Sequence, residues 1–234
     1  MRNPIVNLAL AATASLACTA TTSSRNIRTG GVVARIDVTS ERGGRSVVET
    51  DLVIGGQGSN TYMVLEGGDR LYATAGGDKR PMQATSDGEY EAKFRVDEGE
   101  FVVSLEREVD DPAPDNRGVL PPPFDISSDF GSTPLSRKSD KVVIEWTPAG
   151  SRADVEIEID GKCIHDERYD VGGDPGKFEI RKGEIRAWKS KKDDACDVDV
   201  TVTRTTTGET DPTLDSDSSF RLHQVRRTRF VSGP

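Results

Sequence analysis

Apolar and polar residues alternate with a period of two along most of the chain after residue 30, as expected for β-strands that bury one face. In the first half of the chain this pattern predicts strands at 33–38, 46–54, 61–65, 70–74, 89–96 and 100–107. In the second half it predicts strands at 124–127, 141–146, 153–164, 176–180, 185–188, 196–204 and 220–231. No segment keeps a helical period over several turns, so we expect almost no helix.

The predicted strands are short and are separated by turns rich in Gly and Asp, which is typical of antiparallel sheets with one face in solvent. We therefore predict an all-β fold with two antiparallel β-sandwich domains in tandem, at residues 31–109 and 121–234. Residues 110–120 between them are acidic and rich in Pro, without alternation, and are predicted to be a linker. A jelly roll or a small barrel is the alternative architecture.

The second half of the chain resembles immunoglobulin- and fibronectin-like domains. The resemblance rests on Trp146 in an early strand and on the alternating valines Val198, Val200 and Val202 in a late one. It implies a β-sandwich with an Ig-like arrangement of its two sheets.

The N-terminal residues have the pattern of a signal peptide. Arg2 supplies a positive charge, and residues 5–17 are mostly small or apolar. This run has the length of a signal-peptide core and is too short to span a bilayer as a helix. Residues 1–17 are therefore predicted to be a signal peptide.

The stretch Ser15-Leu16-Ala17-Cys18 closes this leader and resembles the lipobox of bacterial lipoproteins, although Leu stands one position later than usual. The resemblance implies that Cys18 is acylated and becomes the first residue of the mature protein, with a membrane as its partner. Residues 18–30, rich in Thr and Ser, are then predicted to be a flexible tether. Thr19 in place of Asp favours the outer over the inner membrane. The alternative is an ordinary signal, with a periplasmic or secreted protein.

The other two cysteines, Cys163 and Cys196, lie at the ends of two predicted strands. In an oxidising compartment a disulfide between them is expected, and it leaves Cys18 as the odd cysteine. A metal pair, or a nucleophilic Cys163 assisted by His165, is the alternative.

Acidic residues surround Cys163, and Asp166, Asp170 and Asp174 are candidate calcium ligands because Ca²⁺ prefers oxygen donors. Their spacing matches no calcium-loop motif, so a solvated strand end and turn is the competing interpretation. The acidic stretch 207–219, which contains Asp211, Asp215 and Asp217, is interpreted in the same way and is predicted to be a mobile hairpin tip.

The last predicted strand is basic in an acidic protein, and its candidate binding residues are Arg226, Arg227 and Arg229. It could be a charge-protected edge strand, pair with the acidic faces of neighbouring strands, or bind lipid phosphates or anionic glycans. Trp188, beside three lysines, could stack on a sugar or contact a partner, or be a rim aromatic.

The composition narrows the function without identifying a reaction. The chain of 234 residues has a net charge of -9, which argues against a nucleic-acid partner because phosphate binding needs a basic face. No cofactor motif and no convincing catalytic set is present, so we predict a non-enzymatic protein of the cell envelope with a binding or structural role. Its partner is expected to be an envelope protein or a polysaccharide. A carbohydrate-binding accessory protein without an anchor is the second hypothesis, and a hydrolase is the third. The sequence does not indicate an oligomeric state.

Overall fold

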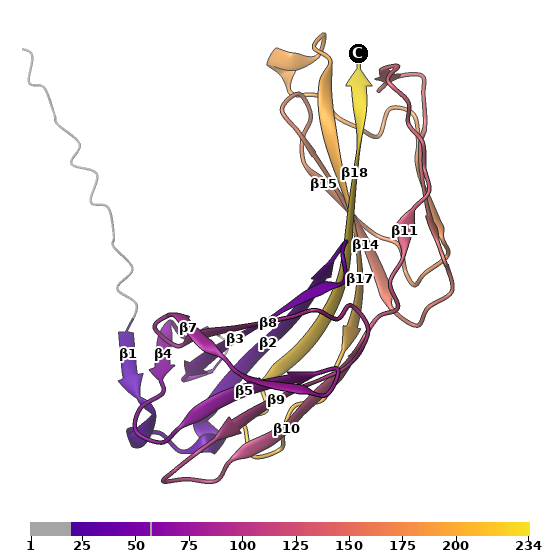
Figure 1. Ribbon diagram of the computed structural model, residues 1–234. Coiled ribbons are helices and arrows are strands. Elements are labelled where there is room, and N and C mark those ends of the chain that lie inside the picture. Colours follow the sequence, from indigo (N-terminus) through magenta and orange to yellow (C-terminus); the bar gives the residue numbers. More distant parts are fainter. Residues whose placement is uncertain (1–19, 57) are drawn as a thin grey trace, which may run out of the picture.

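The computed structural model describes residues 20–56 and 58–234, so the predicted signal peptide and Cys18 lie outside the described residues. Two lobes meet at an angle and are joined by two long strands that run through both (Figure 1). The described part of the chain contains β-strands and three short 3-10 helices, η1 (Ser24–Asn26), η2 (Thr29–Gly31) and η3 (Lys189–Lys191). None of its helices has the length and apolar character needed to span a membrane. The predicted all-β sandwich class is confirmed.

One large sheet forms a layer of both lobes. Its eleven strands are β1 (Ala20–Ser23), β2 (Val32–Glu41), β3 (Arg45–Ile54), β4 (Thr61–Val64), β7 (Gln83–Ser86), β8 (Glu89–Phe94), β12 (Leu135–Ser136), β14 (Asp154–Gly161), β15 (Glu167–Asp170), β17 (Cys196–Thr207) and β18 (Ser219–Gly233). The main order is β1-β4-β3-β2-β18-β17-β14-β15. Most neighbours are antiparallel, but β1 with β4, β2 with β18 and β12 with β18 are parallel.

Two smaller sheets cover the inner face of the large one. A four-stranded sheet covers the first lobe and contains β5 (Arg70–Ala75), β6 (Asp78–Pro81), β9 (Gly99–Glu106) and β10 (Ala113–Leu120). A three-stranded sheet covers the second lobe and contains β11 (Asp125–Ile126), β13 (Val142–Thr147) and β16 (Lys177–Ile180). Each lobe is therefore a β-sandwich with its own hydrophobic core.

The alternation seen in the sequence is the reason for these cores. In β2 the side chains of Val32, Ala34, Ile36 and Val38 are buried, and the residues between Ala34 and Val38 are partly exposed. Because successive side chains of a strand point to opposite faces, one face of β2 joins the first core and the other meets solvent.

The last strand, β18, belongs to both lobes. Phe220 and Leu222 in its first half are part of the first core, whereas Phe230 in its second half is part of the second. Leu214, which precedes the strand, also packs in the first core. The predicted second domain of 121–234 therefore needs correction, because part of this range completes the first sandwich.

The predicted linker 110–120 is wrong, since most of it is the strand β10, paired with β9. Its inward positions include Ala113, Asn116, Gly118 and Leu120, which do not give the apolar alternation of an ordinary strand. The polar side chain of Asn116 can be buried there because its amide nitrogen donates a hydrogen bond to the carbonyl oxygen of Val103 at 2.9 Å.

The predicted flexible tether 18–30 is also corrected where the structure describes it. Ala20–Ser23 pairs with β4, and η1 and η2 follow directly, with Ser24 and Thr29 buried. The low hydrophobicity that suggested disorder is compensated by hydrogen bonds rather than by apolar burial.

The acidic stretch 207–219 is not a mobile hairpin tip, because Asp211 within it is buried. The Asp211 carboxylate accepts hydrogen bonds from the backbone N–H of Asp115 and from Thr213. Its own N–H donates to the Asn116 side chain at 2.9 Å. Burial alone would raise the pKa of Asp211, but these hydrogen bonds hold it below its ordinary value.

Candidate functional site

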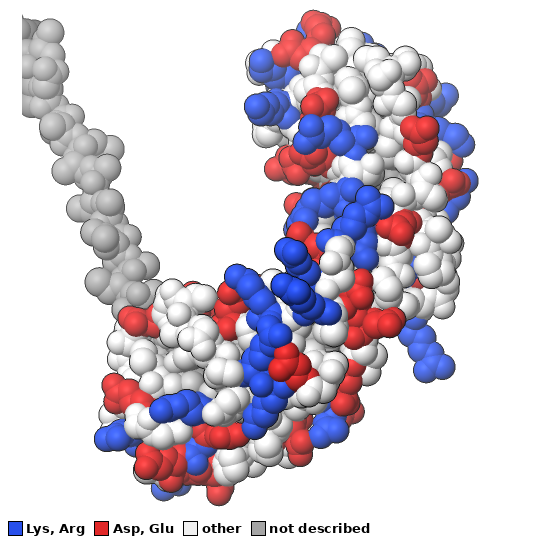
Figure 2. Space-filling model, in the orientation of Figure 1, with Lys and Arg blue, Asp and Glu red and all other residues white. Residues whose placement is uncertain are grey.

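The large sheet has one face that is not covered by the two smaller sheets, and this face lines the concave side of the bend between the lobes (Figure 1). Three hollows of about 720, 520 and 270 Å³ lie on this face. The largest shares Thr39 and Glu49 with the second, and Glu41 and Arg42 with the smallest, so the three are continuous. Figure 2 shows Lys and Arg side chains gathered in this bend. We call the surface the concave face, defined by Asp37, Glu41, Glu49, Arg221, His223 and Arg227.

Exposed arginines of β18 form ion pairs across the sheet with acids of the neighbouring strands. Arg227 contacts Glu41 of β2 at 2.5 Å. Arg229 contacts Asp199 at 2.7 Å and Asp197 at 3.2 Å, both on β17. The predicted pairing with the acidic face of β17 is confirmed. Exposed pairs of this kind contribute little to stability, which leaves them free to exchange partners with a charged ligand.

The acidic face of β14 has a different partner from the one predicted. Glu156 and Glu158 lie 3.5 and 3.4 Å from Arg168 of β15, which is a strand that the alternation did not reveal. The alternative that the last strand is an edge strand holds for part of β18. Residues 219–224 pair with β2 and residues 232–233 with β12, whereas the described chain pairs residues 225–231, which carry the three arginines, with β17 alone.

His223 connects two strands on the concave face. Its Nδ1 lies 2.9 Å from the Thr205 hydroxyl and its Nε2 lies 3.2 Å from Asp37. Burial alone would raise the pKa of Asp37, but the hydrogen bond with His223 and the charge of Arg221 hold it below its ordinary value. Hydroxyl, imidazole and carboxylate have the contact order of a catalytic triad. However, the backbone around His223 is paired with β2 on one side and with β17 on the other. Its N–H groups therefore lie in the plane of the sheet and do not point toward a substrate.

Like charges oppose each other at the far side of the concave face. The register places Glu49 opposite Glu91 and Asp51 opposite Glu89. Burial raises the pKa of Asp51, and the charge of Glu89 raises it further. Carboxylates directly opposite one another destabilise a sheet, so this strip is acidic at a small cost in folding free energy.

Arg226, one of the predicted binding residues, has a structural role. Its side chain is buried, and its Nε donates to the carbonyl oxygen of Phe124 at 2.6 Å. The guanidinium also lies over the Phe124 ring, 5.3 Å from the centroid. Burial lowers the pKa of Arg226. Arg227 and Arg229, by contrast, are on the exposed face, so only these two are available to a ligand.

Trp188 lies at the tip of the second lobe, in front of η3, and is 46% exposed. Its ring packs on His165 with the ring centroids 3.6 Å apart. The backbone N–H of Trp188 donates to Cys163 at 3.2 Å, which fixes the indole to the end of β14. The predicted strand at 185–188 is reduced to a single bridge between Ile164 and Ala187.

The lysines beside Trp188 are partly neutralised by acids of the same loop. Lys191 lies 3.0 Å from Asp194, and Lys192 lies 3.9 Å from Asp193. The loop therefore presents an exposed aromatic surface with mixed charge, which suits a polar partner with apolar patches such as a sugar.

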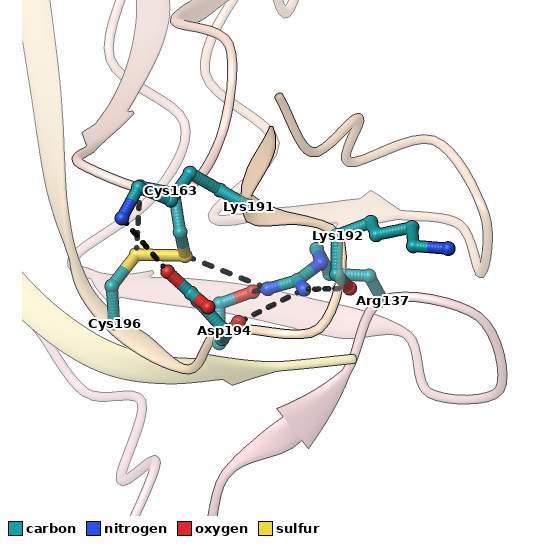
Figure 3. Close-up of a disulfide and its surroundings, with 7 residues drawn as sticks. Arg137, Cys163, Lys191, Lys192, Asp194 and Cys196 are labelled. Atoms are coloured by element: carbon teal, nitrogen blue, oxygen red, sulfur yellow. Dashed lines mark hydrogen bonds and ion pairs between the residues drawn. A yellow bond between two sulfur atoms is a disulfide. The ribbon is translucent and has the colours of Figure 1, made fainter. Parts of the chain in front are cut away.

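The predicted disulfide between Cys163 and Cys196 is confirmed, with a Cα–Cα distance of 5.9 Å (Figure 3). Arg137 is buried beside it and contacts Cys163 Sγ at 3.5 Å. Its guanidinium also donates to the carbonyl oxygens of Lys192 and Asp194, so it connects the bond to the loop before β17. Because the Cys163 sulfur is oxidised, it is not a nucleophile here.

The three candidate calcium ligands do not converge. Asp166 is exposed, and Asp170 accepts a hydrogen bond from the backbone N–H of Gly172. Asp174 is buried and faces Arg204 at 2.9 Å. Within residues 20–56 and 58–234, no group of three or more His, Cys, Asp and Glu side chains is arranged to hold a metal ion.

Two buried ion pairs were missed by the sequence analysis, Arg107 with Asp69 and Arg204 with Asp174. All four side chains are at most 1% exposed. Arg107 ends a predicted strand and Asp69 lies in a Gly-rich turn, and both positions are ordinarily exposed. The one sequence feature that points to a buried ion pair is a single charged residue at an inward position of an otherwise regular strand, as at Arg204.

No family model matches this chain, and no curated protein matches it either. Among solved structures, it is similar to the FN1–FN3 domains of chicken CNTN1, with 10% identity and a TM-score of 0.31 over 88% of this chain and 68% of that one. It is also similar to a DUF3823 family protein from Bacteroides ovatus, with 13% identity and a TM-score of 0.21 over 82% of this chain and 98% of that one. At these TM-scores neither similarity contributes to the functional argument below.

Proposed function

We propose that the protein is a lipid-anchored component of a bacterial cell envelope with a non-catalytic binding or structural role. The observation that carries this proposal is the use of the three cysteines. Cys163 and Cys196 form a disulfide inside the second lobe, which suits an oxidising compartment. Cys18 is then the remaining cysteine of the sequence, at the end of the lipobox-like stretch Ser15-Leu16-Ala17-Cys18.

The concave face supports a binding role. It is a continuous polar surface on a rigid sheet, and its charged side chains are exposed in pairs that a charged ligand can replace. An extended polymer or a flexible segment of an envelope protein fits such a long, shallow surface better than a small substrate does.

The non-catalytic part of the proposal rests on the two histidines. His165 packs on Trp188, and His223 is held between Thr205 and Asp37 on an open sheet face. Hydrolysis of an activated ester by the wild-type protein, abolished in both His223→Gln and Thr205→Val, would contradict it. Equal background rates in all three proteins are expected.

The anchor is tested by mass spectrometry of the mature N-terminus from the membrane fraction. We expect a chain that begins at Cys18 and carries diacylglycerol with a further acyl chain or a free amine. The Cys18→Ser variant should lose the acyl mass and leave the detergent phase. A mature chain that begins elsewhere and lacks lipid would contradict the proposal and favour a periplasmic or secreted protein.

A second candidate function, binding of a carbohydrate or surface polymer, is favoured by the exposed and rigid Trp188. Aromatic rings of this kind offer a flat apolar surface to a sugar ring. Trp188→Ala should abolish retention on immobilised envelope polysaccharide, whereas Lys189→Ala, in the same loop, should weaken it only slightly. Equal retention of wild type and Trp188→Ala would exclude the tip as the binding site.

A further inference from the structure

The N-terminal segment of the described chain is part of the first sandwich. β1 pairs in parallel with β4, and the register begins with Ala20 opposite Thr61. The backbone N–H of Ala20 donates to the carbonyl of Asn60 at 3.3 Å. The first described residue, Ala20, follows Cys18 by two positions and is already paired in the sheet.

A buried arginine holds the residues that follow β1. The Arg107 guanidinium donates to the carbonyl oxygens of Ser24 and Ile27 at 2.8 and 2.9 Å, and to the Thr29 hydroxyl at 3.1 Å. Its charge is balanced by Asp69 at 2.8 Å. An arginine in this position presents several donors in one plane, so it fixes the backbone of the whole segment.

Further hydrogen bonds attach the same segment to the loop after β9. The backbone N–H of Thr29 donates to Asp110 at 2.8 Å, and its hydroxyl donates to the carbonyl of Asp111 at 2.6 Å. Ser24 Oγ accepts from the N–H of Glu66 at 3.1 Å. Opening the segment would leave the buried Arg107 and Asp69 without several of their partners, which is unfavourable.

The short distance from the cysteine to the sheet restricts the position of an anchored molecule. A fully extended chain spans about 3.5 Å per residue, so Cys18 lies within roughly 7 Å of the Ala20 position. The connection from β3 to β4, next to Ala20, has the sequence GGQGSN and contains no charged residue. In a protein of net charge -9, a loop without charged residues of its own reduces repulsion from anionic lipid. The one carboxylate found beside it among the described residues is that of Asp217, 3.7 Å from the position of a Cβ atom at Gly56.

We propose that the end of the first lobe where β1 begins, including Gly58, Ser59 and Asn60, rests against the lipid headgroups of the membrane. The orientation of the body relative to the membrane is then set by the fold rather than by a tether. This proposal rests on the proposed acylation of Cys18. It makes the second lobe, at the other end of the molecule from β1, the part that extends away from the bilayer (Figure 1).

The contact is tested with the full-length lipidated protein in vesicles that contain headgroup spin-labelled lipid. A fluorophore is placed at Gly58→Cys, where an added side chain meets open space, or at Ser190→Cys in the exposed η3. We expect strong quenching at residue 58 and little at 190. A variant with a long Gly/Ser spacer between Thr19 and Ala20 should lose the quenching at residue 58. Equal quenching at the two sites, or no effect of the spacer, would overturn the proposal.

Trypsin tests the rigidity of the connection, because Arg25 and Arg28 lie in the N-terminal segment. A spacer variant that carries one added arginine should be released from the vesicles about tenfold or more faster than wild type, since proteolysis follows the population of open chain. The double variant Arg25→Gln/Arg28→Gln is the matched control. Rapid release of wild type by cleavage at Arg25 or Arg28 would overturn a fixed orientation even if acylation is found. Absence of acyl mass on Cys18 would instead contradict the proposed function.

Discussion

Each lobe contains a fully buried arginine–aspartate pair, but the two pairs hold different parts of the molecule. Arg107 and Asp69 in the first lobe bind the N-terminal segment, residues 20–31, which is distant in sequence. Arg204 and Asp174 in the second lobe bind two connections between strands, through the carbonyl oxygens of Pro122 and Pro148.

The hydrogen bonding of the two arginines also differs. All three nitrogens of Arg107 donate to a partner, whereas Arg204 Nε is the one buried side-chain nitrogen or oxygen without a partner among the described residues. Arg204 lies instead over the ring of Phe124, 4.4 Å from its centroid. The comparison indicates that the first pair holds the N-terminal segment, residues 20–31, which can detach alone. The second pair cannot be opened without separating the sheets of its lobe.

The largest effect is expected from Asp174→Asn. This change leaves Arg204 buried without a countercharge, which typically costs about 3–5 kcal/mol of unfolding free energy. Asp174 also accepts hydrogen bonds from Trp146 Nε1 at 2.6 Å and from Ser151, so the loss reaches the core. Urea denaturation measures it, with Asp170→Asn as the exposed control, expected within about 0.5 kcal/mol of wild type. Equal stability of the two variants would contradict a structural role for the pair.

The next effect concerns the disulfide, which the first lobe lacks within the described residues. Replacing both Cys163 and Cys196 with Ala should lower the unfolding free energy by roughly 3–4 kcal/mol, because the bond closes a loop with a sequence separation of 33. Amide exchange should rise most in the loop before β17, which Arg137 connects to the disulfide. Exchange that rises equally in both lobes would show that the lobes unfold as one unit.

The strands that the sequence predicted correctly are those with at least three successive apolar residues at inward positions, such as Ala34, Ile36 and Val38 in β2 and Val198, Val200 and Val202 in β17. β10 was missed because its inward positions include Asn116 and Gly118. Gly118 is required there because a Cβ atom would lie 3.1 Å from the Gly208 Cα and closer still to Leu222. No local pattern reveals such a close approach between residues far apart in sequence.

The same limit applies to the candidate site. The exposed pairs of Arg229 with Asp197 and Asp199 follow from strand alternation and could be predicted. The burial of Arg226 and Arg107 could not be predicted from the sequence, because their partners are mainly backbone carbonyl oxygens supplied by distant loops. The disulfide was predictable because Cys163 and Cys196 lie at two predicted strand ends, and because the expected signal peptide implies an oxidising compartment.

A smaller and more local effect is expected from Asp69→Asn. Loss of the countercharge to Arg107 can be relieved by detaching the N-terminal segment, so the destabilisation is limited to the free energy of docking that segment. We expect trypsin cleavage at Arg25 and Arg28 to increase, while the urea midpoint falls less than in Asp174→Asn. A loss of global stability as large as that of Asp174→Asn would show that the two pairs have the same role.

The smallest effect is a difference in acid sensitivity between the two pairs. Burial alone would raise the pKa of both aspartates, but hydrogen bonds and the adjacent arginine hold each below the ordinary value of 3.8. A lowered pKa in the folded state means that the stabilisation is complete above pH 3.8 and is lost as the pH falls through the folded value. Each unit by which the pKa is lowered corresponds to about 1.4 kcal/mol. Asp51 has the opposite effect on the pH dependence of stability. Its raised pKa favours folding at low pH, and its contribution becomes unfavourable as the pH rises through the folded-state pKa.

Stability measured by urea titration between neutral pH and the acid range should therefore decline below pH 3.8 in wild type, and Asp174→Asn should flatten that decline. Asp69→Asn should affect mainly the acid-induced opening of the N-terminal segment, measured by amide exchange of β1. If both variants flatten the global decline equally, the first pair is as integral to its sandwich as the second. The N-terminal segment would then detach only when the whole first lobe unfolds, which would strengthen the proposal that the fold sets the orientation of the molecule.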